Sequence, residues 1–235
     1  MFLTLPKPLQ DLWSQYRRLE EPFSFRSEAI TALQIFIKAL LDSPENIWRP
    51  WALSVAAEFV DRGGYLIRDQ LFEQVLFPAL LDGLDNNEPG CARWLGAMAQ
   101  HLYRCPECLR RLGPERSYGE ALFRLALAKD PTDAGARRGL IKIISGHFSY
   151  SLHEQPSGVL FDTNGATPLQ CGQLRSELSE FEILIATEGC AAAYAGLVEK
   201  CRFHFTAYEQ YLAGRPRCPS YAEFIAKSGG GPVAG

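Results

Sequence analysis

A pair of cysteines two residues apart is the spacing in this chain that is most typical of chemistry. Cys105 and Cys108 flank Pro106 and Glu107, and a Cys-x-x-Cys pair can supply two zinc ligands or form a redox-active dithiol. A structural zinc site needs four ligands, and the nearest further candidates are Cys91 and His101. Because no second Cys-x-x-Cys is present, we predict instead a turn between helices, with both thiols half buried and no cofactor. Zinc binding and a redox role are the alternatives.

The other residues that could do chemistry form no catalytic motif. The chain lacks a Gly-x-Ser-x-Gly elbow, a phosphate-binding glycine loop and a Rossmann fingerprint. His153 precedes Glu154, but no histidine follows at the spacing of a metallopeptidase, and His147 would face another side of a helix. Glu180 and Glu182 are two residues apart on a predicted helix and therefore diverge. The sequence thus predicts a protein that is not an enzyme.

Helices must position these residues, because apolar side chains recur at helical spacing and no run alternates as a strand would. The clearest stripe runs from Cys190 to Leu212 in steps of three and four residues. Gly189 separates it from a similar stripe over 174–185. The two stripes predict an antiparallel helical hairpin, with His204 at the border of the second stripe as a packed or rim residue.

The same hairpin pattern continues upstream and defines the predicted fold. Further helices are expected at about 27–41, 49–61, 66–84, 92–103, 118–129 and 133–153. They predict an all-α fold of antiparallel helical hairpins, arranged as an irregular helical bundle or a short α-solenoid. We expect one domain over residues 1–228, with sub-units 1–112 and 113–228 as an alternative, and a flexible tail over 229–235.

Two short stretches resemble known helical repeats. Residues 126–133 followed by Leu140 resemble the boundary between tetratricopeptide repeats, although the Trp and Tyr of that pattern are absent. Residues 77–85 with Arg93 resemble a HEAT repeat. Any helical hairpin with a proline at its turn shows these features, so we prefer the irregular domain and keep a regular repeat array as the alternative.

A loop of about sixteen residues, His153 to Pro168, interrupts the helical pattern. Loops longer than about 12–15 residues in compact domains are often functional or disordered. This loop is therefore a candidate for function.

Charge is distributed unevenly along the chain, although the formal net charge is only −3. Residues 93–142 hold ten basic and five acidic residues, whereas 150–199 hold seven acidic and one basic, and 58–88 hold seven acidic and two basic. Pairing between these segments would use the charges within the molecule. The alternative is electrostatic steering of a partner. The near-neutral total excludes a polycationic nucleic-acid binder.

Composition and segment patterns predict a soluble, cytoplasmic protein. The chain is 47% hydrophobic and 22% charged, which excludes an intrinsically disordered chain. Its seven cysteines are an odd number and a poor disulfide framework, so we expect reduced thiols. No apolar stretch approaches the roughly 20 residues of a membrane-spanning helix, and no secretory signal pattern opens the chain. We therefore expect no membrane association.

One segment resembles proteins that are often encoded beside secreted toxins. It runs from Asp130 through Arg137 and Tyr150 to Leu160, and similar segments occur in poorly characterised proteobacterial proteins. The resemblance covers about 30 of the 235 residues. It implies a bacterial immunity protein of a toxin effector–immunity pair, such as those of type VI secretion. It carries no set of functional residues.

The leading functional hypothesis is a protein-binding module that neutralises a cognate toxin by direct binding. If the toxin is a nuclease, an acidic surface could occupy its phosphate-binding site. The predicted contact residues are Glu154, Asp162, Glu177, Glu180, Glu182 and Glu188. The runner-up is a helical-repeat adaptor or chaperone that holds a peptide in a groove lined by Arg137, Arg138 and Tyr150. A zinc-stabilised domain or enzyme is the third hypothesis.

Overall fold

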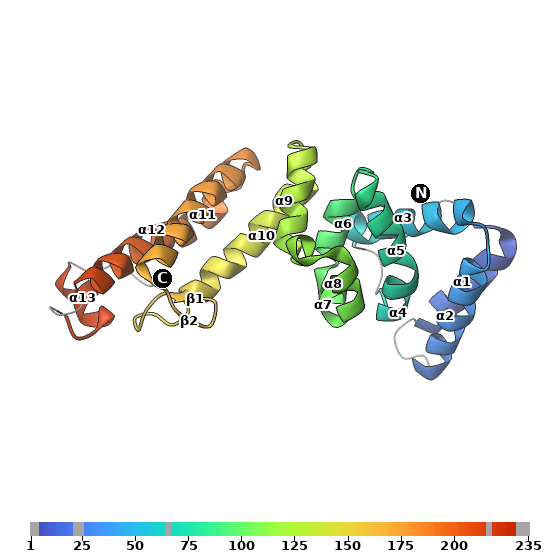
Figure 1. Ribbon diagram of the computed structural model, residues 1–235, viewed down its shortest axis with the longest axis horizontal. Helices are drawn as coiled ribbons and strands as arrows, with labels where there is room; N and C mark the ends of the chain where they lie inside the picture. The colour runs from blue at the N-terminus through green and yellow to red at the C-terminus, as the bar shows by residue number, and fades with distance from the viewer. Residues whose placement is uncertain (1–4, 21–25, 64–66, 215–217, 229–235) are drawn as a thin grey trace. The chain divides into compact units, whose positions relative to one another are not determined.

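Helices make up most of the structure, which confirms the all-α class predicted from the sequence (Figure 1). The computed structural model describes residues 5–20, 26–63, 67–214 and 218–228. The tail predicted to be flexible, 229–235, lies outside the described residues.

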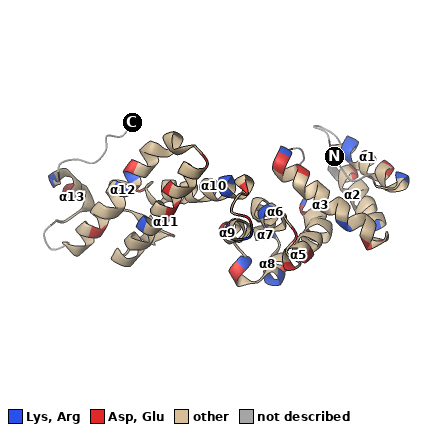
Figure 2. Ribbon diagram, turned by 90° about the horizontal axis from the view of Figure 1, so that it is seen from above, with Lys and Arg blue, Asp and Glu red and all other residues tan. Residues whose placement is uncertain are grey.

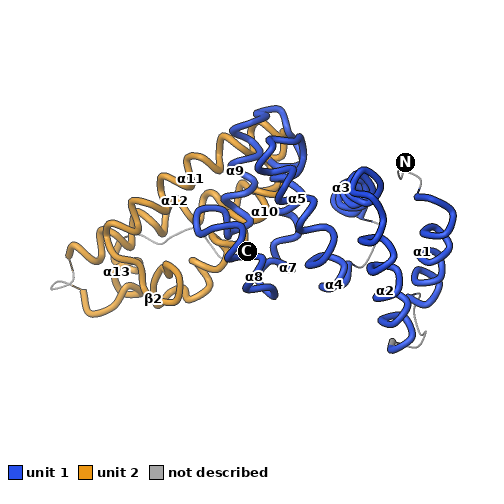
Figure 3. The backbone as a smooth tube through the Cα atoms, turned by 45° about the vertical axis from the view of Figure 1, so that its right-hand side comes forward, with its two compact units in different colours: residues 1–136 blue, residues 137–235 orange. Residues whose placement is uncertain are grey.

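The chain folds into two compact units, residues 1–136 and residues 137–235 (Figure 3). The boundary falls in the first turn of the helix α10 (Ala134–Ser151). It therefore lies further along the chain than the division between 1–112 and 113–228 that the sequence suggested.

The first unit is built from helices and two short helical turns. Its elements are α1 (Lys7–Glu20), α2 (Arg26–Leu41), α3 (Glu45–Arg62), α4 (Asp69–Leu71), the π-helical turn η1 (Phe72–Leu76), α5 (Phe77–Asp85), α6 (Cys91–Ala97), α7 (Ala99–Arg104), α8 (Pro106–Leu112), the 3-10 turn η2 (Pro114–Arg116) and α9 (Gly119–Lys129). Aromatic rings from α1, α2 and α3 pack together in this unit. The ring centroid of Trp13 lies 5.0 Å from that of Phe36 and 5.2 Å from that of Trp51.

Packing between α9 and α6 explains why the unit extends past residue 112. Leu122 and Phe123 of α9 are buried. Gly96 of α6 permits the close approach, because a Cβ atom there would lie 3.2 Å from the carbonyl oxygen of Gly119 and 3.3 Å from the Leu122 and Phe123 side chains. The helix α9 therefore belongs to the core of the first unit.

The second unit contains the predicted antiparallel hairpin. Its elements are α10 from Arg137 onward, β1 (Leu160–Phe161), β2 (Asn164–Gly165), α11 (Pro168–Thr187), α12 (Ala191–Ala213) and α13 (Tyr221–Lys227). The helices α11 and α12 pack along each other and are joined through Gly189, which has φ +72°. The stripe residues Leu174, Phe181 and Phe205 are buried, and so is His204, as the sequence predicted.

A small β-hairpin in the long loop was not expected from the sequence. Leu160 pairs with Gly165, and Phe161 pairs with Asn164. Just outside the hairpin, the Ala166 backbone N–H donates to the Val159 carbonyl oxygen at 2.8 Å. Strands of two residues are too short to show an alternating pattern. The hairpin gives the loop a defined backbone instead of an irregular one.

Candidate functional site

The loop that follows α10 borders a cavity of about 390 Å³ that is open to solvent, within the second unit. Its principal lining residues come from the end of α10, the loop, the β-hairpin and α12: Tyr150, His153, Glu154, Gly158, Gly165 and Tyr208. Of these, Glu154 is a residue that the sequence predicted to contact a toxin, and Tyr150 is one predicted to line the alternative peptide groove. The structure brings both residues to the lining of this cavity.

Three neighbouring side chains form one wall of the cavity. The rings of Tyr150 and His153 stack with their centroids 5.0 Å apart. His153 Nδ1 lies 2.8 Å from the Tyr150 carbonyl oxygen, and its Nε2 lies 3.1 Å from Glu154 Oε1. Tyr150 remains 44% exposed and the Glu154 side chain 52% exposed. The wall thus offers an aromatic face and a carboxylate to a binding group.

Two loop glycines let Tyr208 of α12 approach the loop closely. A Cβ atom on Gly158 would lie 3.1 Å from the Tyr208 hydroxyl oxygen, and one on Gly165 would lie 3.2 Å from it. Sequence reasoning missed all three residues, because Tyr208 belongs to an apolar helix stripe and was assigned to the core. The two glycines in a long loop are the signal that could have indicated a close contact.

Most of the predicted contact acids on α11 and at its C-cap contact basic groups of the same unit. Glu188 lies 3.3 Å from Arg137 and 2.7 Å from Arg138, and Glu177 lies 3.1 Å from His147. Glu182 pairs with Arg202.

The other three predicted acids differ in their surroundings. Glu180 is half buried on α11 and has a contact within the molecule. Glu154 lies in the turn after α10, and Asp162 is exposed at the turn of the β-hairpin. The six acids therefore do not form one solvent-facing surface.

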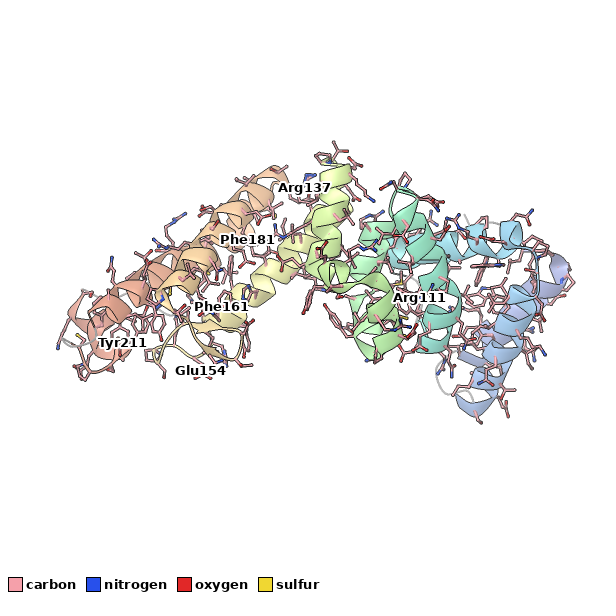
Figure 4. The ribbon with its side chains drawn as sticks, in the orientation of Figure 1. Arg111, Arg137, Glu154, Phe161, Phe181 and Tyr211 are labelled. Carbon is pink, nitrogen blue, oxygen red and sulfur yellow. The ribbon has the colours of Figure 1, made fainter. Side chains whose placement is uncertain are left out.

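The structure does not bring the three residues of the alternative groove together. Arg137 is 9% exposed and lies in the first turns of α10, whereas Tyr150 lies near the last residue of the same helix. Figure 4 shows Arg137 near the start of this helix and Glu154 beyond its end. Both Arg137 and Arg138 bind Glu188 rather than lining the cavity.

The Cys105–Cys108 pair forms the predicted turn between helices. Cys105 is the N-cap of α8, its sulfur accepts the Cys108 backbone N–H at 3.2 Å, and Pro106 begins the helix. Both thiols are more deeply buried than predicted, at 8% and 3% exposure. Burial and the bond to Cys105 raise the pKa of the Cys108 thiol to about 12. This thiol is therefore a weak nucleophile near neutral pH.

The other two zinc candidates have different partners. His101 Nδ1 lies 2.6 Å from Asp69 Oδ1, and its ring stacks on Phe72 at 5.1 Å. Burial raises the pKa of the Cys91 thiol to about 11, and the Glu88 carboxylate adds to this. Within the described residues, no three His, Cys, Asp or Glu side chains form a group that could hold a metal ion.

Ion pairs also connect the charged segments of the first unit. Arg93 binds both Asp61 and Asp133, and Arg116 lies 2.8 Å from Asp85. Figure 2 shows basic and acidic segments together on helices of both units. Part of the uneven charge along the sequence is therefore used for pairing within each unit.

Comparisons with known proteins identify no relative of this chain. No protein-family model, no curated protein and no solved structure matches the chain. Among the described helices, none is both long enough and apolar enough to cross a membrane.

Proposed function

We propose that this chain is a protein-binding module that neutralises a cognate bacterial toxin by direct contact, as an immunity protein does. The resemblance of the segment from Asp130 to Leu160 to proteins encoded beside secreted toxins supports the toxin as partner. The observation that carries the proposal is the cavity after α10, where Tyr150 and Glu154 line one wall and are partly exposed.

The loop is a better contact surface than α11 on electrostatic grounds. The Glu188 and Glu177 side chains are only 16% and 17% exposed, and they lie against Arg137 and His147 of the same unit. Glu154 is 52% exposed, and Asp162 is exposed at the hairpin turn. Exposed acids steer a positively charged partner and fix its orientation, whereas paired acids contribute little to the external field.

The aromatic content of the site also suits a protein partner. Tyrosine is enriched among the residues that dominate binding energy at protein interfaces, because it buries a large ring and keeps a hydroxyl for hydrogen bonding. Tyr150 is 44% exposed at the cavity, and Leu169 near the loop is 76% exposed at the start of α11. A nuclease with a basic cleft is the toxin class that the acidic loop would fit.

The product of the neighbouring gene is the partner to test. We expect it to bind the full chain in calorimetry, and we expect expression of the chain to restore growth of cells that express that product. Reversing both loop acids, Glu154→Lys with Asp162→Lys, should weaken binding at least about tenfold and reduce its salt dependence. The matched control is Glu199→Lys, an exposed acid on α12, which should change affinity less than about twofold.

Two outcomes would overturn this proposal. One is the absence of both binding and growth rescue with the neighbouring product. The other is equal weakening by the loop variant and by the Glu199 variant, which would place the contact elsewhere. Reversing Glu177 or Glu188 is avoided, because either change would break an ion pair within the unit.

A further inference from the structure

The Cys105–Cys108 pair is a motif of the sequence that the proposed function does not use. Both side chains lie within a single helical turn, because Cys105 is the N-cap of α8 and Cys108 is the third residue of that helix. The Cys105 backbone N–H donates to the Leu102 carbonyl oxygen at 3.0 Å, and the Cys105 carbonyl oxygen accepts the Leu109 N–H at 3.1 Å. These bonds hold the backbone on both sides of Cys105.

The two thiols are in contact within this turn. The Cys105 sulfur accepts the Cys108 backbone N–H at 3.2 Å, so the Cys105 side chain is turned toward the second cysteine. A hydrogen bond between the two side chains contributes to the raised pKa of Cys108. Residues three apart in a helical turn have Cα atoms about 5 Å apart, which falls within the range that a disulfide spans. The backbone of this turn therefore suits a disulfide between the two cysteines.

Burial decides which oxidant can reach the pair. Cys105 is 8% exposed and Cys108 is 3% exposed, so a reagent meets Cys105 first. Bulky disulfides need open access to the sulfur with which they react, whereas hydrogen peroxide is nearly as small as water. The pair therefore favours the smallest oxidants over larger ones.

We propose that Cys105 and Cys108 form a reversible disulfide when the chain meets a hydroperoxide. In the first step the Cys105 sulfur attacks one peroxide oxygen and the O–O bond breaks. Cys105 becomes a sulfenic acid, and the thiol proton leaves with the released hydroxide as water. In the second step the Cys108 sulfur attacks the Cys105 sulfur, the S–S bond forms, and the S–O bond breaks to release a second water. Two thiols and one hydrogen peroxide thus give one disulfide and two waters, and a thiol reductant reverses the change.

The contact between the thiols explains how Cys108 can react in the second step. Its raised pKa makes it a weak nucleophile toward reagents in solution. Its target in this step is a sulfur that it already touches, and a positioned neighbouring group reacts far faster than the same group supplied from solution. None of the other five cysteines has a second cysteine within the same helical turn. The proposal concerns this pair alone and does not depend on the toxin-binding function.

Peptide mapping of the full chain tests the proposal directly. Trypsin releases residues 105–110 as one peptide, because Arg104 precedes it and Arg110 ends it, and this peptide contains no cysteine outside the pair. The folded chain is treated with hydrogen peroxide, unfolded in iodoacetamide, digested and analysed by mass spectrometry. We expect the peptide to lose two hydrogen atoms and to take up no iodoacetamide. After treatment with dithiothreitol, both cysteines should take up the reagent again.

Two serine variants separate the roles of the two thiols. In Cys108→Ser the sulfenic acid on Cys105 should persist at least about tenfold longer and be trapped by dimedone, because the intramolecular thiol is missing. In Cys105→Ser the remaining Cys108 should take up no dimedone. The matched control is Cys190→Ser, which removes a half-buried thiol outside the pair and should leave the disulfide yield of peptide 105–110 unchanged.

Uptake of iodoacetamide at both cysteines of the peptide, or at Cys108 alone, after a peroxide dose that oxidises Cys190 would overturn the proposal. A disulfide that forms only at urea concentrations that unfold the chain would overturn it as well. Equal dimedone labelling of Cys105 and Cys108 would overturn the assignment of Cys105 as the first thiol to react. The result on the unchanged chain holds even if a serine variant fails to fold.

Discussion

One buried imidazole holds the last described helix against α12. His204 is 7% exposed, and its Nδ1 lies 2.8 Å from the hydroxyl oxygen of Tyr221 in α13. The hydroxyl can donate to Nδ1 only while the imidazole is neutral. Burial lowers the pKa of His204 from 6.5 to about 4, and the charge of Lys200 adds to this effect. The folded state therefore favours the neutral ring.

This shift predicts that the second unit loses stability in mild acid. Because the unfolded chain binds a proton near pH 6.5 and the folded chain only near pH 4, the contribution of His204 is complete above pH 6.5. It is lost as the pH falls toward 4. The loss is at most about 3–4 kcal/mol, at about 1.4 kcal/mol per pKa unit. Urea unfolding of the full chain at several pH values between 4 and 7 measures it.

A variant without the titrating group provides the control for this prediction. His204→Gln should lower the free energy of unfolding at pH 7 and should flatten its pH dependence between 6.5 and 4. An equally steep pH dependence in His204→Gln would assign the effect to other groups.

At the scale of the elements, periodic patterns in the sequence were reliable and long-range contacts were not visible. The stripes around Phe181 and Phe205 predicted the α11–α12 hairpin, because a helical period fixes which side chains share a face. The pairing of Arg137 with Glu188 joins residues 51 positions apart, and no local pattern indicates such a contact. Tyr208 illustrates the same limit, since its stripe assigned it to the core although it also lines the cavity.

The contact between α5 and α6 depends on the absence of one side chain. A Cβ atom on Gly83 of α5 would lie 2.4 Å from Cys91 Sγ of α6, and Cys91 is fully buried. We predict that Gly83→Ala destabilises the first unit by about 1–3 kcal/mol through overpacking. The control is Gly196→Ala in α12, where nothing lies within 4 Å and the better helix propensity should stabilise by about 0.5–1 kcal/mol.

A double-mutant cycle separates this contact from a general intolerance of alanine. Cys91→Ala removes the sulfur that the new methyl group would meet, so Gly83→Ala should cost markedly less in that background. Urea unfolding of the four proteins gives the coupling between Gly83 and Cys91. Additive costs would show that the Sγ contact does not limit the packing of α5 on α6.

At the scale of the whole molecule, uneven charge along the chain does not require uneven charge on the surface. Arg137 and Arg138, from the basic stretch of the sequence, both bind Glu188, from the acidic stretch. In the first unit, Arg93 and Arg116 bind acids of the preceding acidic stretch. These charges stabilise the two units. The loop acids are more exposed: the Glu154 side chain lies 3.1 Å from His153 but is still 52% exposed.

If the buried ion pairs stabilise the units and the exposed acids do not, removing an internally paired acid should lower the free energy of unfolding. Removing an exposed acid should change it little. Glu188→Gln would leave Arg137, whose side chain is only 11% exposed, without a carboxylate, and should destabilise the chain by about 1–3 kcal/mol. Glu182→Gln would break a pair with Arg202, whose side chain is 65% exposed, and should cost less than about 1 kcal/mol. Urea unfolding at pH 7 compares the two variants with the unchanged chain. Equal losses would mean that the Arg137–Glu188 pair is as solvent-screened as a surface pair, and Glu188 would then return to the acids that a partner could contact.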